Sequence, residues 1–253
     1  MSGLSPRRAG LWSAGGLIAF LAAWELAVQT GLLPRMMVPP PSAVPGTFLS
    51  ELRNGIWVAS VVASLSHYLI GLAIGSLLGI ASGVAVALSA RIGAAQSGIA
   101  RLLRPIPPLA WIPFALIWFG ASEGAAAFII AIGVFWVNYF AAAAAVRAID
   151  PGLHEVTAAF GQHGLGARLS KIVLPGASPG IMAGFRAGLG QGWMAVVAAE
   201  LFGIPGIGQR MSDAAGLLAT DVLVLYMLTI ALLYTASDVA FQAVSRRMLA
   251  WMP

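Results

Sequence analysis

The sequence predicts an all-α polytopic membrane protein with six transmembrane helices in one domain over residues 1–253, and three observations favour it. First, 59% of the 253 residues are hydrophobic and only 9% are charged, whereas a soluble domain carries about 25% charged residues. Second, several apolar runs reach the ~20 residues that a helix needs to cross a bilayer core of ~30 Å. Third, Lys and Arg gather in alternate connections between these runs.

The composition also excludes several classes of function. Without cysteine, the chain has neither a disulfide framework nor a thiolate metal site. The net charge of +5 comes with no basic cluster beyond pairs such as Arg7–Arg8, so nucleic acid is not an expected partner. The only lysine, Lys171, follows Ser170 and is outside any Gly-x-x-x-x-Gly-Lys-Ser/Thr pattern. We therefore expect no nucleotide site, catalytic residue, metal or cofactor in this chain.

The first predicted span covers residues 11–29 and follows Arg7 and Arg8, which places the N-terminus in the cytoplasm. Glu25 lies near the far end of this span. It is interpreted as a residue at the membrane surface, with a role in transport as the alternative. Five prolines in the connection 30–56 exclude a continuous helix before about Ser42. A short interfacial helix is expected from residue 44 to 54.

The second predicted span, residues 57–88, is long enough to begin at the membrane surface and then cross. On its helix, glycines at every fourth position would form a groove without side chains, where another backbone can approach closely. His67 near its start is interpreted as a structural histidine, with a pathway role as the alternative. The glycines are Gly71, Gly75, Gly79 and Gly83.

Residues 89–104 carry three arginines and no acid, which predicts a cytoplasmic connection. The third span, 105–120, has four prolines in its first nine residues and hence a broken entry. Irregular backbone at membrane depth is tolerated only where protein buries it or where it lines a cavity, so this segment is a candidate wall of a pathway. In the fourth span, 125–145, Asn138 is expected to form an interhelical hydrogen bond, with a substrate contact as the alternative.

Residues 150–175 form a polar, glycine-interrupted segment between apolar runs. Asp150 is a candidate N-cap, and apolar residues then recur at helical spacing up to Gly161. A second apolar stripe begins at Leu165 and ends at Pro175. The pattern predicts two short amphipathic helices that lie at the membrane surface.

The fifth span, 176–202, has glycine at every fourth position from 176 to 192, which suits packing within the bundle or across a dimer axis. Arg186 lies about 16 Å beyond Pro175 and needs a partner, for which Glu200, Asp238 or an anionic substrate are candidates. Glu200 is interpreted as a gate or as a structural brace. The sixth span covers 222–244. Candidate pathway residues are Arg186, Glu200, Asn138, Gln191 and Trp193, and candidate packing residues add Gly180, Gly184 and Gly188.

The fourteen Lys and Arg residues support this topology. Ten fall in connections assigned to the cytoplasm, three lie outside and Arg186 lies in the membrane. Both termini and the segment 150–175 are therefore expected inside the cell. The ten are residues 7, 8, 91, 101, 104, 147, 168, 171, 246 and 247.

Glu155, Gly161 and the ending Ile172–Pro175 resemble the EAA loop of permease subunits of ABC importers. Val156 and Thr157 stand where the family has two alanines, and the stretch after Gly161 is one residue longer. The resemblance is greatest to permeases for nitrate, sulfonates and taurine. Further residues that carry it are Ile106–Pro107–Pro108, Trp118–Phe119–Gly120, Val146–Arg147, Asp150–Pro151, Gly184–Phe185–Arg186 and Ala199–Glu200.

This resemblance implies the MetI-like fold of type I ABC importers in a bacterial inner membrane. It implies a homodimer surrounded by lipid, two cytoplasmic ATPase subunits that hold ATP and Mg, and an extracytoplasmic substrate-binding protein. The segment 150–175 would then be the coupling loop that docks on the ATPase. The coupling residues would be Glu155, Ala158, Ala159, Gly161, Gly164, Leu165, Arg168 and Pro175.

Other interpretations remain open from the sequence. The solute could be a sulfonate, taurine, nitrate, bicarbonate or a thiamine-pyrimidine-like precursor. An ion-coupled secondary transporter would use intramembrane acids, for which Glu25, Glu200 and Asp238 are available. A membrane assembly factor without transport activity is a third class, which leaves the loop 150–175 unexplained.

Overall fold

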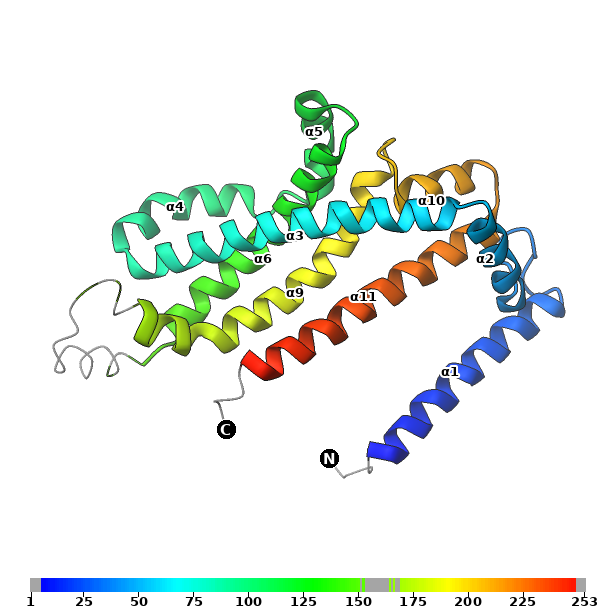
Figure 1. The fold of residues 1–253 in the computed structure, drawn as a ribbon, viewed down its shortest axis with the longest axis horizontal. Helices are drawn as coiled ribbons and strands as arrows, with labels where there is room; N and C mark the ends of the chain where they lie inside the picture. Colours follow the sequence, from blue (N-terminus) through cyan, green and yellow to red (C-terminus); the bar gives the residue numbers. More distant parts are fainter. Residues whose placement is uncertain (1–5, 151, 153–163, 165, 167–168, 249–253) are drawn as a thin grey trace. The chain divides into compact units, whose positions relative to one another are not determined.

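The computed structural model describes residues 6–150, 152, 164, 166 and 169–248, and these residues form helices and turns without a strand (Figure 1). Its helical elements are α1 (Pro6–Gln29), η1 (Pro41–Ala43), α2 (Val44–Arg53), α3 (Ile56–Leu88), α4 (Ala90–Leu103), η2 (Pro108–Trp111), α5 (Ile112–Phe119), α6 (Glu123–Arg147), η3 (Leu169–Val173), α9 (Leu174–Glu200), α10 (Ile207–Gly216) and α11 (Thr220–Met248).

Among the described residues, four helices are long and apolar enough to cross a membrane: α1 from Gly10, α3, α6 and α11. The bent pair of α4 with Pro108–Phe119 would make a fifth span. The prediction of an all-helical, multi-span protein is confirmed, but the count of six is not. Helix α9 has 27 residues, and its many glycines replace the large apolar side chains of a usual span.

The region of the predicted third span differs from the expectation. Helix α4 covers most of residues 89–104, for which the sequence predicted a connection without indicating its secondary structure. The axis bends by 90° between α4 and Pro108–Phe119. Pro105 and Pro107 lie in the break, where a helix interior would lose hydrogen bonds. Helix α5 has only 8 residues, about 12 Å, and is followed by Gly120, whose φ is 67°.

Close contacts divide the chain into two units, residues 61–209 with 230–253 and residues 1–60 with 210–229.

In the larger unit, the glycine face of α3 lies directly against the backbone of α6 (Figure 1). A Cβ atom built on Gly75 would lie 2.5 Å from the carbonyl oxygen of Ala131, and one on Gly79 would lie 2.6 Å from that of Phe135. Because both helices repeat this contact every fourth residue, only hydrogen atoms fit between them. Gly71 and Gly83 extend the same face.

Helix α9 brings a second glycine face to another side of α6. Cβ atoms built on Gly180 and Gly184 would collide with the Cβ atoms of Ala145 and Ala141, and one on Gly188 would lie 2.9 Å from Asn138 Nδ2. Both glycine faces therefore make contacts within one chain. Helix α6 is held between α3 and α9 by backbones and small side chains.

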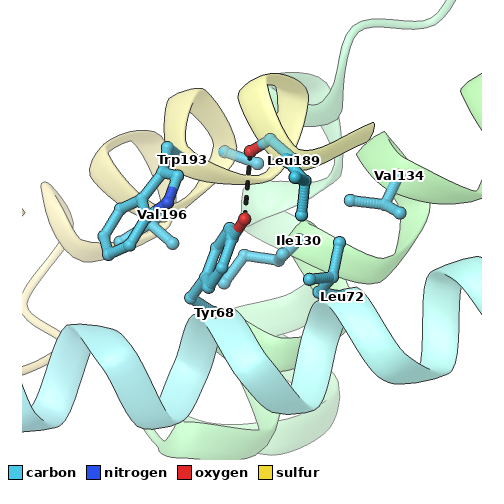
Figure 2. Packing of buried hydrophobic residues seen from close by; sticks show 8 residues of the cluster. Tyr68, Leu72, Ile130, Val134, Leu189, Trp193 and Val196 are labelled. Atoms are coloured by element: carbon cyan, nitrogen blue, oxygen red, sulfur yellow. Dashed lines mark hydrogen bonds between the residues drawn. The ribbon is translucent and has the colours of Figure 1, made fainter. Parts of the chain in front are cut away.

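Larger side chains fill the space where these three helices meet (Figure 2). Tyr68 of α3 stacks on Trp193 of α9, with ring centroids 4.3 Å apart and ring planes 20° from parallel. The Tyr68 hydroxyl donates a hydrogen bond of 3.3 Å to the Leu189 carbonyl. Ile130 and Val134 of α6 complete this core, in which every side chain is buried.

Helix α9 begins at Leu174, directly after a π-helical turn, so Pro175 lies in its first turn and does not precede it. A first-turn proline costs no hydrogen bond. Pro179 lies farther inside the helix and has no N–H for the Pro175 carbonyl. The Ser178 hydroxyl donates to that carbonyl at 2.8 Å, which replaces the missing bond.

In the smaller unit, polar contacts join α2 to α10 and α11. Glu51 accepts hydrogen bonds from Arg210 Nη2 at 2.6 Å, from Arg210 Nε at 3.1 Å and from the Tyr226 hydroxyl at 2.9 Å. At the end of α1, Glu25 accepts bonds of 3.0 and 2.8 Å from the backbone N–H and hydroxyl of Ser42. The short helix predicted for residues 44–54 is α2, which ends at Arg53.

The Glu51–Arg210 pair predicts a pH dependence. The hydrogen bond from Arg210, aided by that from Tyr226, lowers the pKa of Glu51 below its ordinary 4.5, although burial acts in the opposite direction. A carboxylate with a lowered folded-state pKa stabilises the protein above its unfolded pKa, and this stabilisation disappears as the pH falls through the folded value. We expect Glu51→Gln to lower the melting temperature of the purified protein at pH 7, and the difference to shrink below about pH 4.

The control is Asp213→Asn, an exposed acid on the same helix as Arg210. Its melting temperature should follow the wild type at every pH. A Glu51→Gln deficit that stays constant from neutral to acid pH would contradict the role of the charged pair.

Candidate functional site

A cavity of about 400 Å³ opens at the bend between α4 and α5. Helices α6 and α9 form its other walls. The prediction that the proline-rich segment lines a cavity agrees with this geometry. The lining residues are Arg104, Ile106, Pro107, Pro108, Gly133, Trp136, Val137, Phe140 and Gln191.

Arg104 and Gln191 bring polar groups to this cavity. The Arg104 guanidinium carbon lies 4.4 Å above the centroid of the Phe140 ring, a cation–π contact that holds the charge at the cavity wall. A Cβ atom built on Gly133 would lie 3.6 Å from Gln191 Nε2 and 3.2 Å from Pro108 Cγ, so the amide and the proline converge where α6 has no side chain. Trp136 stacks on Phe140 at 6.1 Å.

This set of groups fits a small anion. The guanidinium supplies a permanent positive charge and N–H donors, and the amide supplies two more donors. Two aromatic rings and two prolines give the cavity an apolar wall beside these polar groups. Sequence reasoning selected Gln191 but missed Arg104, because counting charges assigned this arginine to a cytoplasmic connection. Arg104 directly precedes the proline-rich segment, and this position in the sequence could have indicated that it lies at the bend.

Arg186 pairs with Asp238 of α11, one of the two acids expected from the sequence. Its Nε and Nη2 donate to the two carboxylate oxygens at 2.6 and 2.8 Å, and Gln242 Nε2 donates to the same carboxylate at 2.7 Å. Arg186 also lines a separate cavity of about 450 Å³ with Gln242, Ser245 and Arg246. The bidentate pair thus ties α9 to α11 and leaves the arginine facing a second space.

Glu200 is fully buried and is hydrogen-bonded on several sides. It accepts bonds of 2.8 Å from the Ser64 hydroxyl and from the Gly208 N–H, and its other oxygen lies 2.9 Å from His67 Nδ1. The Ser64 hydroxyl in turn accepts from the Ile207 N–H at 2.8 Å. This geometry is that of a brace which joins α3, α9 and the start of α10.

Two further predicted residues lie in the helix interface. Asn138 is 1% exposed and its Nδ2 donates to Ser76 of α3 at 3.3 Å, which is the interhelical bond expected from the sequence. Trp193 is 2% exposed and donates to Ser237 at 3.3 Å, so it belongs to the core and does not line the cavity at the bend.

Most of the predicted coupling segment lies outside the described residues, including Glu155, Ala158, Ala159, Gly161, Leu165 and Arg168. Gly164 is described and exposed, and Pro175 is half-buried. In the part of the chain that the structure describes, no group of three His, Cys, Asp or Glu side chains is arranged to hold a metal ion.

Comparison with known sequences gives consistent matches. A family model described as the inner membrane component of binding-protein-dependent transport systems matches residues 71–250. The taurine transport system permease protein TauC of Escherichia coli (strain K12) is 32% identical over 94% of this chain and 89% of TauC. The putative aliphatic sulfonates transport permease protein SsuC of the same organism is 34% identical over 93% of this chain and 90% of its own length. The bicarbonate transport system permease protein CmpB of Synechococcus elongatus is 31% identical over 79% and 75%.

Solved structures match at the level of the fold. A chain of the inward-facing MetNI methionine ABC transporter superposes with a TM-score of 0.63 at 22% identity, and the match covers 77% of this chain and 98% of the other. A chain of an amino acid ABC transporter superposes with a TM-score of 0.57 at 16% identity, covering 81% and 98%.

Proposed function

Because this chain belongs to the family of binding-protein-dependent transport system inner membrane components and has the MetI-like fold of type I ABC importer permeases, we propose that it forms the translocation pathway of an ATP-driven importer for a small anionic solute. The single observation that carries the solute class is the cavity at the α4–α5 bend, which Arg104 and Gln191 both line.

The chemistry of that cavity agrees with the solutes named for the relatives. Taurine and aliphatic sulfonates carry a sulfonate group, and bicarbonate is itself an oxyanion. Each presents oxygen acceptors that suit a guanidinium and an amide. The aromatic and proline wall would receive the short carbon chain of a sulfonate. A sulfonate or taurine-like solute is therefore our first choice, and bicarbonate, nitrate or a thiamine-pyrimidine-like precursor is the alternative.

The energy for transport would come from partner subunits. The chain has no Walker A sequence, since its only lysine lies outside such a pattern. We propose a homodimer of this chain in a bacterial inner membrane, bound to two cytoplasmic ATPases and supplied by an extracytoplasmic binding protein. The distribution of Lys and Arg supports a location of both termini and the segment 150–175 on the ATPase side.

The packing of α6 and α9 supports a route from the ATPase to the cavity. The segment 150–168 lies in sequence between the end of α6 and the π-turn that begins α9. These two helices contact each other through small residues such as Gly184 and Ala141, and they carry the cavity residues Trp136 and Gln191. A displacement of the segment by the ATPase would move both helices and so reshape the cavity.

An ion-coupled carrier is the second candidate, and its proposed ion sites are engaged in other contacts. Asp238 is paired with Arg186, Glu200 is bonded to His67 and Ser64, and Glu25 is bonded to Ser42. A carboxylate in such a network has fewer lone pairs for a transported cation. This arrangement favours the ATP-driven importer.

Co-purification tests the proposed function. We expect that the tagged chain, co-expressed with candidate ABC ATPases, purifies as a 2:2 complex, and that Glu155→Arg abolishes ATPase recovery while membrane insertion continues. The matched control is Glu123→Arg, an exposed acid at the opposite end of α6, which should keep the complex. A wild-type chain that takes up solute on an ion gradient without any ATPase would overturn the proposal.

A further inference from the structure

A second cavity, of about 240 Å³, lies between α4 and the C-terminal half of α6. Three arginines line it, and its lining contains no carboxylate. Tyr139 and Ser97 add hydroxyl groups, and small apolar side chains form the rest. The lining residues are Val86, Gly93, Ser97, Ala100, Arg101, Arg104, Tyr139, Phe140, Ala143 and Arg147.

The three arginines are not neutralised by acids within the described residues. The ion pairs of arginine there join Arg186 to Asp238 and Arg210 to Glu51. Arginine keeps its charge at all physiological pH values, and its planar fork matches the oxygens of an oxyanion. All three arginines are exposed, so water screens much of their mutual repulsion, and a bound anion would lower the part that remains.

This arginine-lined cavity adjoins the cavity at the α4–α5 bend, since Arg104 and Phe140 line both. The Arg104 guanidinium carbon lies 4.4 Å from the centroid of the Phe140 ring, and this cation–π contact uses no oxygen acceptor. Along α6, the two linings extend from Gly133 to Arg147, about 21 Å at the rise of a helix. Together they follow the half of α6 that ends next to the segment 150–168.

We propose that the arginine-lined cavity is an anion-binding station on the inward side of the pathway. This inference rests on the proposed function. The solute leaves the first cavity by giving up its contact with Gln191 while it keeps the one with Arg104, and Arg101 and Arg147 then hold it before release to the cytoplasm. The ligand is a small oxyanion group, a sulfonate or bicarbonate, because the space accommodates a charged head group and few further atoms.

Uptake by the complete importer tests this assignment. The chain is reconstituted with its ATPase and binding protein in proteoliposomes, and ATP-dependent uptake of radiolabelled taurine, ethanesulfonate and bicarbonate is measured. With the transported solute, we expect Arg101→Gln and Arg147→Gln to lower the maximal uptake rate at least about tenfold, as the loss of a charge-assisted hydrogen bond implies. ATP hydrolysis stimulated by the binding protein should remain within about twofold of wild type, and Arg147→Lys should recover part of the uptake.

The matched control is Arg91→Gln, because Arg91 is an exposed arginine on α4 that does not line the cavity. It should transport as wild type does. If the two cavity variants also transport like wild type, the station is refuted while the importer function stands. If wild type shows no ATP-dependent uptake of any anion, the proposed function fails and the station fails with it.

An anionic lipid headgroup would present the same chemistry to these arginines. Proteoliposomes of phosphatidylcholine alone and of phosphatidylcholine with phosphatidylglycerol separate the two sources. We expect the defects of Arg101→Gln and Arg147→Gln to be equal in both. If the wild-type uptake rate falls to the level of the variants when phosphatidylglycerol is left out, the cavity binds a lipid headgroup. That outcome would overturn the proposal of a solute-binding station.

Discussion

Replacing Gly75 with alanine is expected to destabilise the protein strongly, although the same change in an open part of a helix stabilises it. The new methyl carbon would lie 2.5 Å from the carbonyl oxygen of Ala131 and 2.9 Å from the Ala131 Cα. Both atoms belong to the backbone of α6, so no side-chain rotation relieves the clash. Helix α3 would have to move away from α6 and give up contacts along the whole glycine face.

The matched control is Gly98→Ala in the interior of α4. A Cβ atom at Gly98 has no neighbour within 4 Å, and the residue is exposed. Alanine is favoured over glycine in a helix interior by about 0.5–1 kcal/mol. Melting temperatures of the purified proteins should therefore change in opposite directions, down for Gly75→Ala and level or slightly up for Gly98→Ala. If Gly75→Ala melts like wild type, the close approach of α3 and α6 is wrong.

The glycine faces illustrate how far the sequence can be interpreted. Glycines at every fourth position predict that another helix backbone lies close to Gly75, because a helix face without side chains permits close approach. The spacing does not identify which helix that is. The partner is α6, whose alanine-rich composition would suit contact with several helices. Its register, with the carbonyls of Ala131 and Phe135 opposite the glycines, depends on helix rotations that emerge only from tertiary packing.

The candidate site, too, could be predicted from the sequence only in part. Helix ends are close to their predicted positions because caps, prolines and apolar runs act locally. The 90° bend after α4 is not predictable from the prolines alone, because proline breaks a helix without fixing the direction of the next one. For this reason charge counting assigned Arg104 to a cytoplasmic connection and did not show that it lines a cavity at the bend. For Arg186 the sequence left Glu200, Asp238 and an anionic substrate as candidate partners, and the structure pairs it with Asp238.

Removal of the Glu200 carboxylate is expected to cost about 3–5 kcal/mol of folding free energy. The change Glu200→Ala leaves the Gly208 N–H and the Ser64 hydroxyl without their buried acceptor, and it removes the partner of His67. Each buried donor without a partner costs about 1–3 kcal/mol, and two such donors together with the lost His67 contact give this range. A Cβ atom built on Gly206 would collide with the carboxylate, so the surrounding backbone is shaped to this side chain.

Thermal unfolding of the purified protein measures this cost, with a drop in melting temperature on the order of ten degrees for Glu200→Ala. The isosteric change Glu200→Gln separates a brace from a gate, because the amide oxygen still accepts from Ser64 and Gly208. If Glu200 is a structural brace, Glu200→Gln should recover much of the stability that Glu200→Ala loses. Solute uptake should then follow stability across the two variants. A gate predicts near-normal stability with lost uptake for Gln, and that outcome would move Glu200 from the packing of α3, α9 and α10 into the transport cycle.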